Sequence, residues 1–527
     1  MKYKYLLLLL TATTLLLSVA RAQREEIPYQ DVTDICKTCV CLSSQDSNNG
    51  VHRNLNCAMK NFKHILARWP PEFGTKHTGT EIVASYSGNK IRLLQQLPAT
   101  TAVVTFSCRH CGMQQLQAPL FMDVPNVEGL YLSWNEISDD ALKPDLFRGP
   151  FNSTKYEPIA LKDLDLSHNR IARLDRKLFE HTPQLKKLSL AYNRLSILDA
   201  ATTASLASIT NLQRLDLSYN GLLTLPAELF PQLRNLHILD VSGNQFAVVP
   251  NSIQQLGKSL QQLNLAGNPM TKIDAHSFQH LDALRRLNIS EMTMLRSIEL
   301  GALELPGLEH LYCARNPKLE RLEFVDLLQS RNLTQLDISQ NALTTLALNM
   351  SSNSSNASWP RLRSLAIAGN PWYCSCELLQ ALEQAGAPQV LQPLTVVPRC
   401  ETPYLLAGAP LSNMTAEQIC NMVIPKKYRA VEDDPPRFLR RRYIILTVII
   451  ASVVVVAGLV IGFIVVCVRR RLKGNDYGVQ PIRYTSVRGS NLSAFSQLQP
   501  ASVTSKFNNA AGTAAGAGAG TTGAPNA

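Results

Sequence analysis

One leucine pattern recurs along the middle of the chain and constrains the fold more than any other feature. It has the form L-x-x-L-x-L-x-x-N-x-L, and its cleanest copy is Leu161, Leu164, Leu166, Asn169 and Ile171. Copies begin at Val103, Val127, Leu161, Leu185, Leu212, Leu236, Leu260, Leu284, Leu308, Leu333 and Leu362, at intervals of 24 to 34 residues. Such a period is typical of a solenoid, because one copy cannot bury its leucines alone and stacked copies share an interior.

The spacing within each copy predicts a short strand followed by a turn. Alternation at the second and third leucines turns those side chains inward, and the residues between them face the outside of a curved parallel sheet. The asparagine faces inward where the chain leaves the strand, so its amide needs backbone partners in neighbouring turns. We call these residues the asparagine ladder: Asn135, Asn169, Asn193, Asn220, Asn244, Asn268, Asn316, Asn341 and Asn370. The pattern is that of the leucine-rich repeat and predicts an α/β solenoid with a concave parallel sheet. A degenerate twelfth copy is expected at Tyr86, Asn89 and Ile91.

Cysteines bracket the repeats. Cys36, Cys39, Cys41 and Cys57 precede them, and Cys374, Cys376, Cys400 and Cys420 follow. The end copies of a solenoid expose its apolar interior, so they need caps, and a small cap needs covalent support. A secreted context favours disulfides over a zinc site, although four cysteines permit three connectivities in each cap.

The two cysteine runs resemble the flanking caps of extracellular leucine-rich-repeat proteins. These runs are C-x-x-C-x-C-x15-C at the N-terminal side and Asn370-Pro371-Trp372-Tyr373-Cys374-Ser375-Cys376 at the other. The resemblance implies the pairs Cys36 with Cys41, Cys39 with Cys57, Cys374 with Cys400, and Cys376 with Cys420. The N-terminal run departs from the family pattern because it lacks the common proline after its first cysteine.

Three further cysteines lie inside the repeats. Cys108 and Cys313 occupy the third-leucine position and Cys111 the asparagine position, so all three are expected to face inward. We interpret them as buried thiols, since buried cysteine packs as a small apolar residue, in preference to a Cys108–Cys111 bridge or redox site.

Two apolar segments indicate the membrane topology. The run Leu6–Leu17 follows Lys2 and Lys4 and precedes a small-residue cleavage site, which is typical of a signal peptide. Residues 443–468 carry no charge and are long enough to span a bilayer. Basic residues flank this segment on both sides, so the charge bias does not decide its orientation. The cysteine-rich caps and the N-glycosylation sequons described below decide it. They predict a single-pass type I protein of the plasma membrane with its N-terminus outside.

The expected organisation follows from these features. The segments are a signal peptide at 1–22, an N-terminal cysteine-rich cap and lead-in at 23–80, leucine-rich repeats at 81–370, a C-terminal cap at 371–421, a stalk at 422–442, a transmembrane helix at 443–468 and a disordered cytoplasmic tail at 469–527.

The net charge of +12 does not indicate nucleic acid. Residues 1–22 hold three basic residues, residues 426–442 hold seven basic against three acidic, and residues 469–527 hold seven against one. These segments account for the whole excess of positive charge, and the repeats are nearly neutral. Basic residues beside a membrane segment are expected to attract anionic lipid.

Seven N-x-S/T sequons before the membrane segment fit a secreted route. They are Asn152, Asn288, Asn332, Asn349, Asn353, Asn356 and Asn413. Asn288 lies between the second and third inward positions of its copy, so its side chain is expected on the concave sheet. A glycan there would hinder that part of the surface.

Aromatic residues precede the ladder asparagine in four successive copies. They are Trp134, His168, Tyr192 and Tyr219, and we call them the aromatic row; Gly243 and Gly267 take the next two positions. Strands about 4.8 Å apart would stack these side chains into a surface suited to a protein ligand. The alternative is that such residues are simply common at this position. We predict that a partner binds the earlier copies, from Trp134 to Tyr219.

The sequence contains no group of residues that supports an enzymatic function. Asp165, Asp216, Asp240 and Asp337 recur with the repeat period, which favours a solvated sheet face over a metal or acid–base site. His276 and His280 lack the glutamate of a zinc helix. We find no nucleophile motif or phosphate loop and expect no cofactor or metal.

The tail is too short for a kinase or Toll-type domain, so signalling would need cytosolic adaptors. Tyr477 and Tyr484 are candidate phosphorylation sites, and Tyr484 also begins a Y-x-x-Φ internalisation pattern. Gly458 and Gly462 are four apart in the membrane segment, where a homodimer could pack closely.

The layout resembles single-pass leucine-rich-repeat adhesion and recognition receptors, which implies binding of an extracellular or cell-surface protein. The alternative is a co-receptor that modulates a signalling receptor in the same membrane.

Overall fold

The structure is a computed structural model that describes most of the repeat region, both caps and one long helix. The described residues are 35–45, 50–70, 73, 79–322, 326–327, 330–346, 360–384, 397–422 and 435–473. The chain divides into two compact units, Met1–Arg441 and Arg442–Ala527. The predicted signal peptide, the sequons Asn349, Asn353 and Asn356, and Tyr477 and Tyr484 lie outside the described residues.

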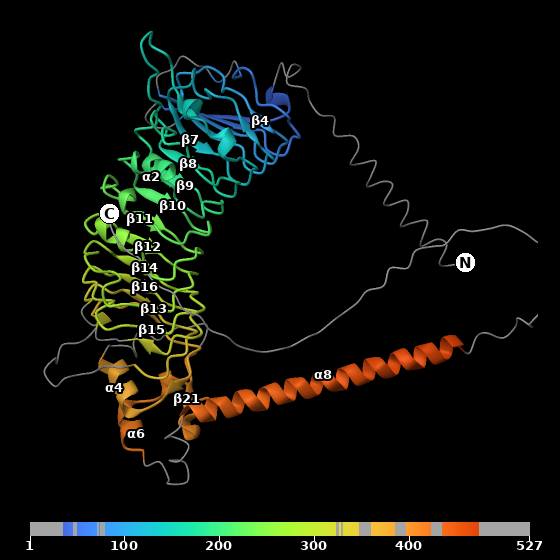
Figure 1. The fold of residues 1–527 in the computed structure, drawn as a ribbon, viewed down its shortest axis with the longest axis vertical. Coiled ribbons are helices and arrows are strands. Elements are labelled where there is room, and N and C mark those ends of the chain that lie inside the picture. Colours follow the sequence, from blue (N-terminus) through green and yellow to red (C-terminus); the bar gives the residue numbers. More distant parts are fainter. Residues whose placement is uncertain are drawn as a thin grey trace, which may run out of the picture. The chain divides into compact units, whose positions relative to one another are not determined.

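A single sheet runs through the first unit, with its strands stacked one after another in chain order (Figure 1). Its strands in spatial order are β1 (Val40–Gln45), β2 (Val51–Asn56), β3 (Thr80–Ser85), β5 (Val103–Ser107), β7 (Val127–Tyr131), β8 (Asp163–Asp165), β9 (Lys187–Ser189), β10 (Arg214–Asp216), β11 (Ile238–Asp240), β12 (Gln262–Asn264), β14 (Arg286–Asn288), β16 (His310–Tyr312), β18 (Gln335–Asp337) and β19 (Ser364–Ala366). The β1–β2 pair is antiparallel, and the later pairs are parallel. The register aligns the repeats, since Leu215 lies opposite both Leu188 and Leu239.

Short elements return the chain between strands. Helix α2 (Ala200–Ala207) lies in the 27-residue interval, and its N-cap Asp199 accepts a hydrogen bond from the Thr202 N–H. Other returns use 3-10 turns or short strands. Three two-residue strands form a second small sheet: β13 (Lys272–Ile273), β15 (Ser297–Ile298) and β17 (Arg321–Leu322). Two more, β4 (Leu93–Leu94) and β6 (Gln115–Leu116), pair with each other. Intervals of 24 residues contain a 3-10 turn in some copies, such as η6 (Ala227–Leu229), and a short strand in others, such as β13, so interval length alone does not set the returning element.

The leucines form one continuous apolar interior from Ile35 in the first cap to Ala416 in the second. Phe121, Phe147 and Phe179 stack within it at centroid distances of 6.2 and 6.1 Å. The expected degenerate copy is present, because Tyr86 and Ile91 are fully buried beside Asn89. The repeats thus share the interior that their spacing predicts.

The asparagine ladder closes the backbone inside each turn. Asn244 is 1% exposed; its Oδ1 accepts hydrogen bonds from the N–H groups of Asn220 and Leu222. Its Nδ2 donates to the carbonyls of Leu217 and Val241 at 3.0 and 2.9 Å. One amide therefore satisfies buried groups in two neighbouring repeats.

Disulfides close both ends of the array. The bonds are Cys36–Cys41, Cys39–Cys57, Cys374–Cys400 and Cys376–Cys420, the same pairs that the family resemblance implies. In the second cap, helices α4 (Cys376–Gln384) and α6 (Ala416–Cys420) pack together, and the fully buried Trp372 donates its indole N–H to the Ile367 carbonyl.

The interpretation of Cys108 and Cys111 as free thiols is wrong, because they form a disulfide. Both side chains do face inward, but they lie on either side of one turn with their Cα atoms 5.9 Å apart, a normal separation for a bridge. Asn135 fixes both backbones, since it accepts from the Cys111 N–H and donates to the Cys108 carbonyl. Cys313 is free and buried, and burial raises its pKa to about 12.

The second unit contains most of helix α8 (Pro435–Lys473). Within it, Ile444–Val465 form a 22-residue segment with a mean hydropathy of 3.2, long and apolar enough for a single membrane span. Gly458 and Gly462 have open space beside their Cα atoms, so nothing in the helix fills the notch that they leave.

Candidate protein-binding surface

The residue before each ladder asparagine adopts the left-handed backbone conformation. The φ angles are 60° at Trp134, 53° at His168, and 54° at both Tyr192 and Tyr219. Gly243, Gly267, Arg315 and Gln340 have φ between 56° and 69°, as does Glu291, which precedes Met292 at the corresponding position. Here the chain bends out of the strand, so these side chains project together at the carboxyl ends of the strands. A side chain in this conformation costs about 1–2 kcal/mol relative to the right-handed helical region.

The four rings of the aromatic row stack on one another. Trp134 lies 3.7 Å from His168, His168 lies 4.1 Å from Tyr192, and Tyr192 lies 4.2 Å from Tyr219, all measured between ring centroids. The planes of each pair differ by no more than 11°. Trp134, Tyr192 and Tyr219 still expose 50%, 43% and 44% of their surface. The rings are therefore held in place by each other and remain available to a partner.

A fifth ring, His110, stacks on Trp134 at 5.0 Å and was missed by the sequence analysis. Its left-handed φ of 54° matches that of the row. The signal was present, since His110 precedes Cys111 at the asparagine position, but only copies with an asparagine there were compared. His110 also lies inside the Cys108–Cys111 loop, so the disulfide spans the start of the stack.

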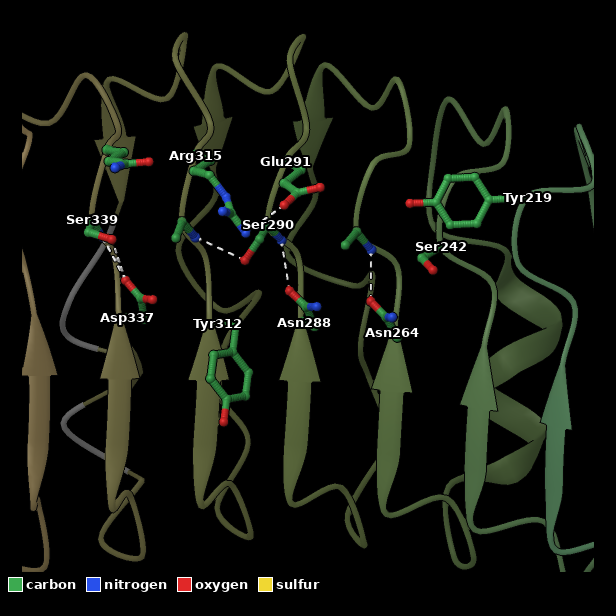
Figure 2. A pocket seen from close by; sticks show the side chains of 13 residues that line it. Tyr219, Ser242, Asn264, Asn288, Ser290, Glu291, Tyr312, Arg315, Asp337 and Ser339 are labelled. Carbon is green, nitrogen blue, oxygen red and sulfur yellow. Dashed lines mark hydrogen bonds and ion pairs between the residues drawn. The ribbon is translucent and has the colours of Figure 1, made fainter. Parts of the chain in front are cut away.

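The stack ends where glycine begins. A Cβ atom on Gly243 would lie 2.5 Å from the Tyr219 ring, closer than any real contact. Figure 2 shows the Tyr219 hydroxyl directed along the sheet toward the copies that carry Asn264 and Asn288. Gly243 thus provides the space that the last ring occupies.

Burial in the stack shifts the pKa values of two side chains of the row. It lowers the pKa of His168, an effect that nearby Asp165 opposes and His110 reinforces. It raises the pKa of Tyr192, and the side-chain hydrogen bond with Tyr219 acts in the same direction. Both shifts favour the uncharged forms of these two side chains.

The aspartate row has a local partner in each repeat. Asp165, Asp216, Asp240 and Asp337 accept hydrogen bonds from the hydroxyl of the serine two residues later, at 2.6 to 2.7 Å. The same oxygens accept from the serine N–H groups. These carboxylates are half-buried turn caps rather than freely solvated groups. Within the described residues, no cluster of three metal-ligating side chains is found.

A polar hollow of about 400 Å³ lies on the concave face beyond the row (Figure 2). Tyr219 forms one side, and Asn264, Asn288, Tyr312, Glu291 and Arg315 contribute to the rest. Glu291 and Arg315 form an ion pair of 2.6 Å. The sequon residue Asn288 therefore projects from the concave sheet, as its spacing indicates.

The other described sequons lie away from the row. Asn152 is exposed in the inserted loop closed by the Phe151–Tyr156 bridge. Asn332 accepts a hydrogen bond from Arg361, and Asn413 is exposed in a 3-10 turn of the second cap.

A curved parallel sheet, an asparagine ladder and disulfide caps define a class of fold, the leucine-rich-repeat solenoid with capped ends. The family model described as "Leucine rich repeat" matches residues 159–213 and 210–270.

Two curated relatives match parts of the repeat region. Mouse transforming growth factor beta activator LRRC32 is 33% identical over 24% of this chain and 17% of the relative. Human podocan-like protein 1 is 28% identical over 40% of each chain. The matches therefore span less than half the length of either relative. A solved leucine-rich-repeat protein from Leptospira interrogans covers 61% of this chain and 92% of its own, at 20% identity and a TM-score of 0.37.

Proposed function

We propose that this protein is a single-pass cell-surface receptor whose leucine-rich-repeat ectodomain binds an extracellular or cell-surface protein through the aromatic row. The observation that supports this most is the stack of half-exposed rings from Trp134 to Tyr219. A relative named as an activator of transforming growth factor beta also supports a role in binding other proteins.

The row has the physical properties of a binding hot spot. Aromatic side chains supply large contact areas and are enriched where interfaces are strongest. Mutual stacking fixes these rings before any partner arrives, so little side-chain entropy is lost on binding. Their Tyr and His edges can also form hydrogen bonds to a protein surface.

Membrane placement is part of the same proposal. The signal-like N-terminus, the disulfide caps and the sequons favour an extracellular array, and Ile444–Val465 would cross the plasma membrane once. The basic tail after the helix would then face anionic lipid and cytosolic adaptors.

A binding screen with a matched variant tests the role of the row. The purified ectodomain is screened against secreted and cell-surface proteins, and each hit is retested with Trp134, Tyr192 and Tyr219 all changed to alanine. We expect the triple variant to weaken binding at least about 100-fold, since hot-spot residues are each worth roughly 2 kcal/mol or more.

The control for this screen changes exposed apolar residues off the row, Phe151 and Leu300, to alanine. This variant should bind as the wild type does. Equal binding by the triple variant and the wild type would remove the proposed site.

The alternative role, a co-receptor in the same membrane, draws on the open notch at Gly458 and Gly462. One relative is named as an activator of transforming growth factor beta, so a signalling protein is a reasonable ligand class. Cell aggregation separates the roles: tailless protein that still aggregates cells favours adhesion. Loss of signalling on changing both glycines to leucine, with aggregation intact, favours the co-receptor.

A further inference from the structure

The polar hollow beyond Tyr219 has a lining that suits carbohydrate. Tyr219 and Tyr312 supply aromatic surface, while Asn264, Glu291 and Arg315 supply planar donors and acceptors. Sites of roughly 300–1,000 Å³ hold small ligands, so a hollow of about 400 Å³ has room for the first sugars of a chain.

The amide of Asn288 is oriented for attachment from inside this hollow. Its Oδ1 accepts a hydrogen bond from the Ser290 N–H at 3.1 Å, which fixes the plane of the amide. Figure 2 shows the amide nitrogen turned away from that bond. This nitrogen is the atom that carries an N-linked glycan, and Asn288-Ile289-Ser290 is a complete sequon.

Asn264 occupies the same position one strand earlier and behaves differently. Its Oδ1 accepts from the Ala266 N–H in the same way, but its Nδ2 donates to the Asp240 carboxylate at 2.9 Å. The residue opposite Asn264 on the preceding strand is Asp240, whereas the residue opposite Asn288 on its preceding strand is Asn264. Asn264 is not in a sequon, so the chain itself provides an unmodified counterpart.

The serine of the sequon is buried in the folded protein. Ser290 is 6% exposed, and its hydroxyl accepts a hydrogen bond from the Ala314 N–H at 3.1 Å. The folded site is therefore closed to an enzyme that must read the serine, so a glycan at Asn288 would have to be added to the nascent chain before this repeat folds.

We propose that Asn288 carries an N-linked glycan whose first sugars are seated in the polar hollow, against Tyr312 and the Glu291–Arg315 pair. This rests on passage through the secretory route, which belongs to the proposed function. The seated glycan covers the concave face immediately beyond Tyr219. It thereby confines a protein ligand to the aromatic row and the copies before it.

The test measures how fast the glycan is removed from the intact protein. Full-length protein from transfected animal cells is treated with peptide N-glycosidase, and release at each sequon is followed by mass spectrometry. We expect Asn288 to be occupied and its glycan to leave the native protein at least about ten-fold more slowly than the denatured protein, because removal needs local opening. Glycans on the exposed Asn152 and Asn413 should leave both forms at similar rates.

A variant tests the seat itself. Tyr312→Ala keeps the sequon intact and removes one wall of the hollow, so it should bring native release at Asn288 toward the denatured rate. An unoccupied Asn288, or equal release from native and denatured wild-type protein, would overturn the proposal. Neither result depends on a ligand, so the outcome is separate from that of the binding screen.

Discussion

At the scale of single residues, the position before each ladder asparagine decides where the surface is aromatic. The left-handed conformation there favours glycine, yet the first copies hold histidine, tryptophan and tyrosine. Stacking between rings offsets part of the backbone strain, since aromatic pairs are worth roughly 0.5–1.5 kcal/mol. The change to Gly243 and Gly267 then ends the stack.

Replacing Gly243 with alanine should disturb the end of the row. The new Cβ would lie 2.5 Å from the Tyr219 ring at a φ of +62°. We expect a loss of about 1–3 kcal/mol of unfolding free energy, from backbone strain together with displacement of the ring. Gly267→Ala is the matched control, because its Cβ would meet only Gly243 backbone atoms at 3.5 and 3.6 Å.

Urea denaturation of both glycine variants makes the comparison. Gly267→Ala should show the backbone cost alone, and Gly243→Ala should be the less stable of the two. Equal losses in the two variants would contradict the account of why the stack ends.

Replacing Asp216 with asparagine should flatten the pH dependence of stability. Burial raises the pKa of Asp216, and the charge of Asp240 raises it further against the Ser218 hydrogen bonds. A carboxyl group whose pKa is higher in the folded than in the unfolded state stabilises the fold fully below its unfolded pKa, near 4. This contribution to the free energy of unfolding is lost as the pH rises through the folded pKa. The wild type should therefore lose stability over that window, and the variant should lose less.

Asparagine can keep the turn, because Asn264 and Asn288 accept the corresponding N–H bonds in their own repeats. At pH 7 the variant should be as stable as the wild type or slightly more so, within about 0.5 kcal/mol of it at worst. Urea midpoints measured from pH 4 to 7 check this, and parallel curves for the two proteins would refute it.

At the scale of elements, each repeat depends on its asparagine more than on its strand. A three-residue strand contributes few hydrogen bonds of its own, whereas Asn244 joins groups in two repeats. Its replacement by alanine leaves buried N–H and carbonyl groups unpaired. We expect a loss of about 3 kcal/mol or more, since each such group costs roughly 1–3 kcal/mol.

Asn264→Ala is the control for this prediction. Asn264 lies half-buried on the concave face, and its side chain bonds Asp240 and the Ala266 N–H. Its loss should cost about 1 kcal/mol or less because water can replace it. Chemical denaturation that gives similar losses for the two variants would show that the ladder has no special role.

The period of the leucines made the repeat strands, the inward asparagines and the position of Asn288 predictable from the sequence. The β1–β2 pair was not predictable in this way, because Val40–Gln45 carries no leucine pattern. The Cys108–Cys111 bridge was considered but rejected in favour of buried thiols, because inward direction alone does not say whether two cysteines meet. The stacking of the rings could be predicted from the spacing of the strands. The end of the stack at Gly243 could not, because it depends on where the Tyr219 ring lies.

At the scale of the whole molecule, the first unit is held by one interior that both caps close. Stability in such an array is a sum of repeats and their interfaces, so the end copies need protection from water. Trp372 is fully buried under the second cap, and Trp69 is 7% exposed near the first. Trp134, on the outer surface, is 50% exposed.

Oxidative labelling of tryptophan on intact cells tests the central claim most directly. A membrane-impermeant oxidant is applied to cells that express the full-length chain, and modification is read at each tryptophan by mass spectrometry. An extracellular folded array predicts rapid oxidation of Trp134 and protection of Trp69 and Trp372. Oxidation of Trp134 only after permeabilisation, or equal oxidation of Trp372, would contradict it.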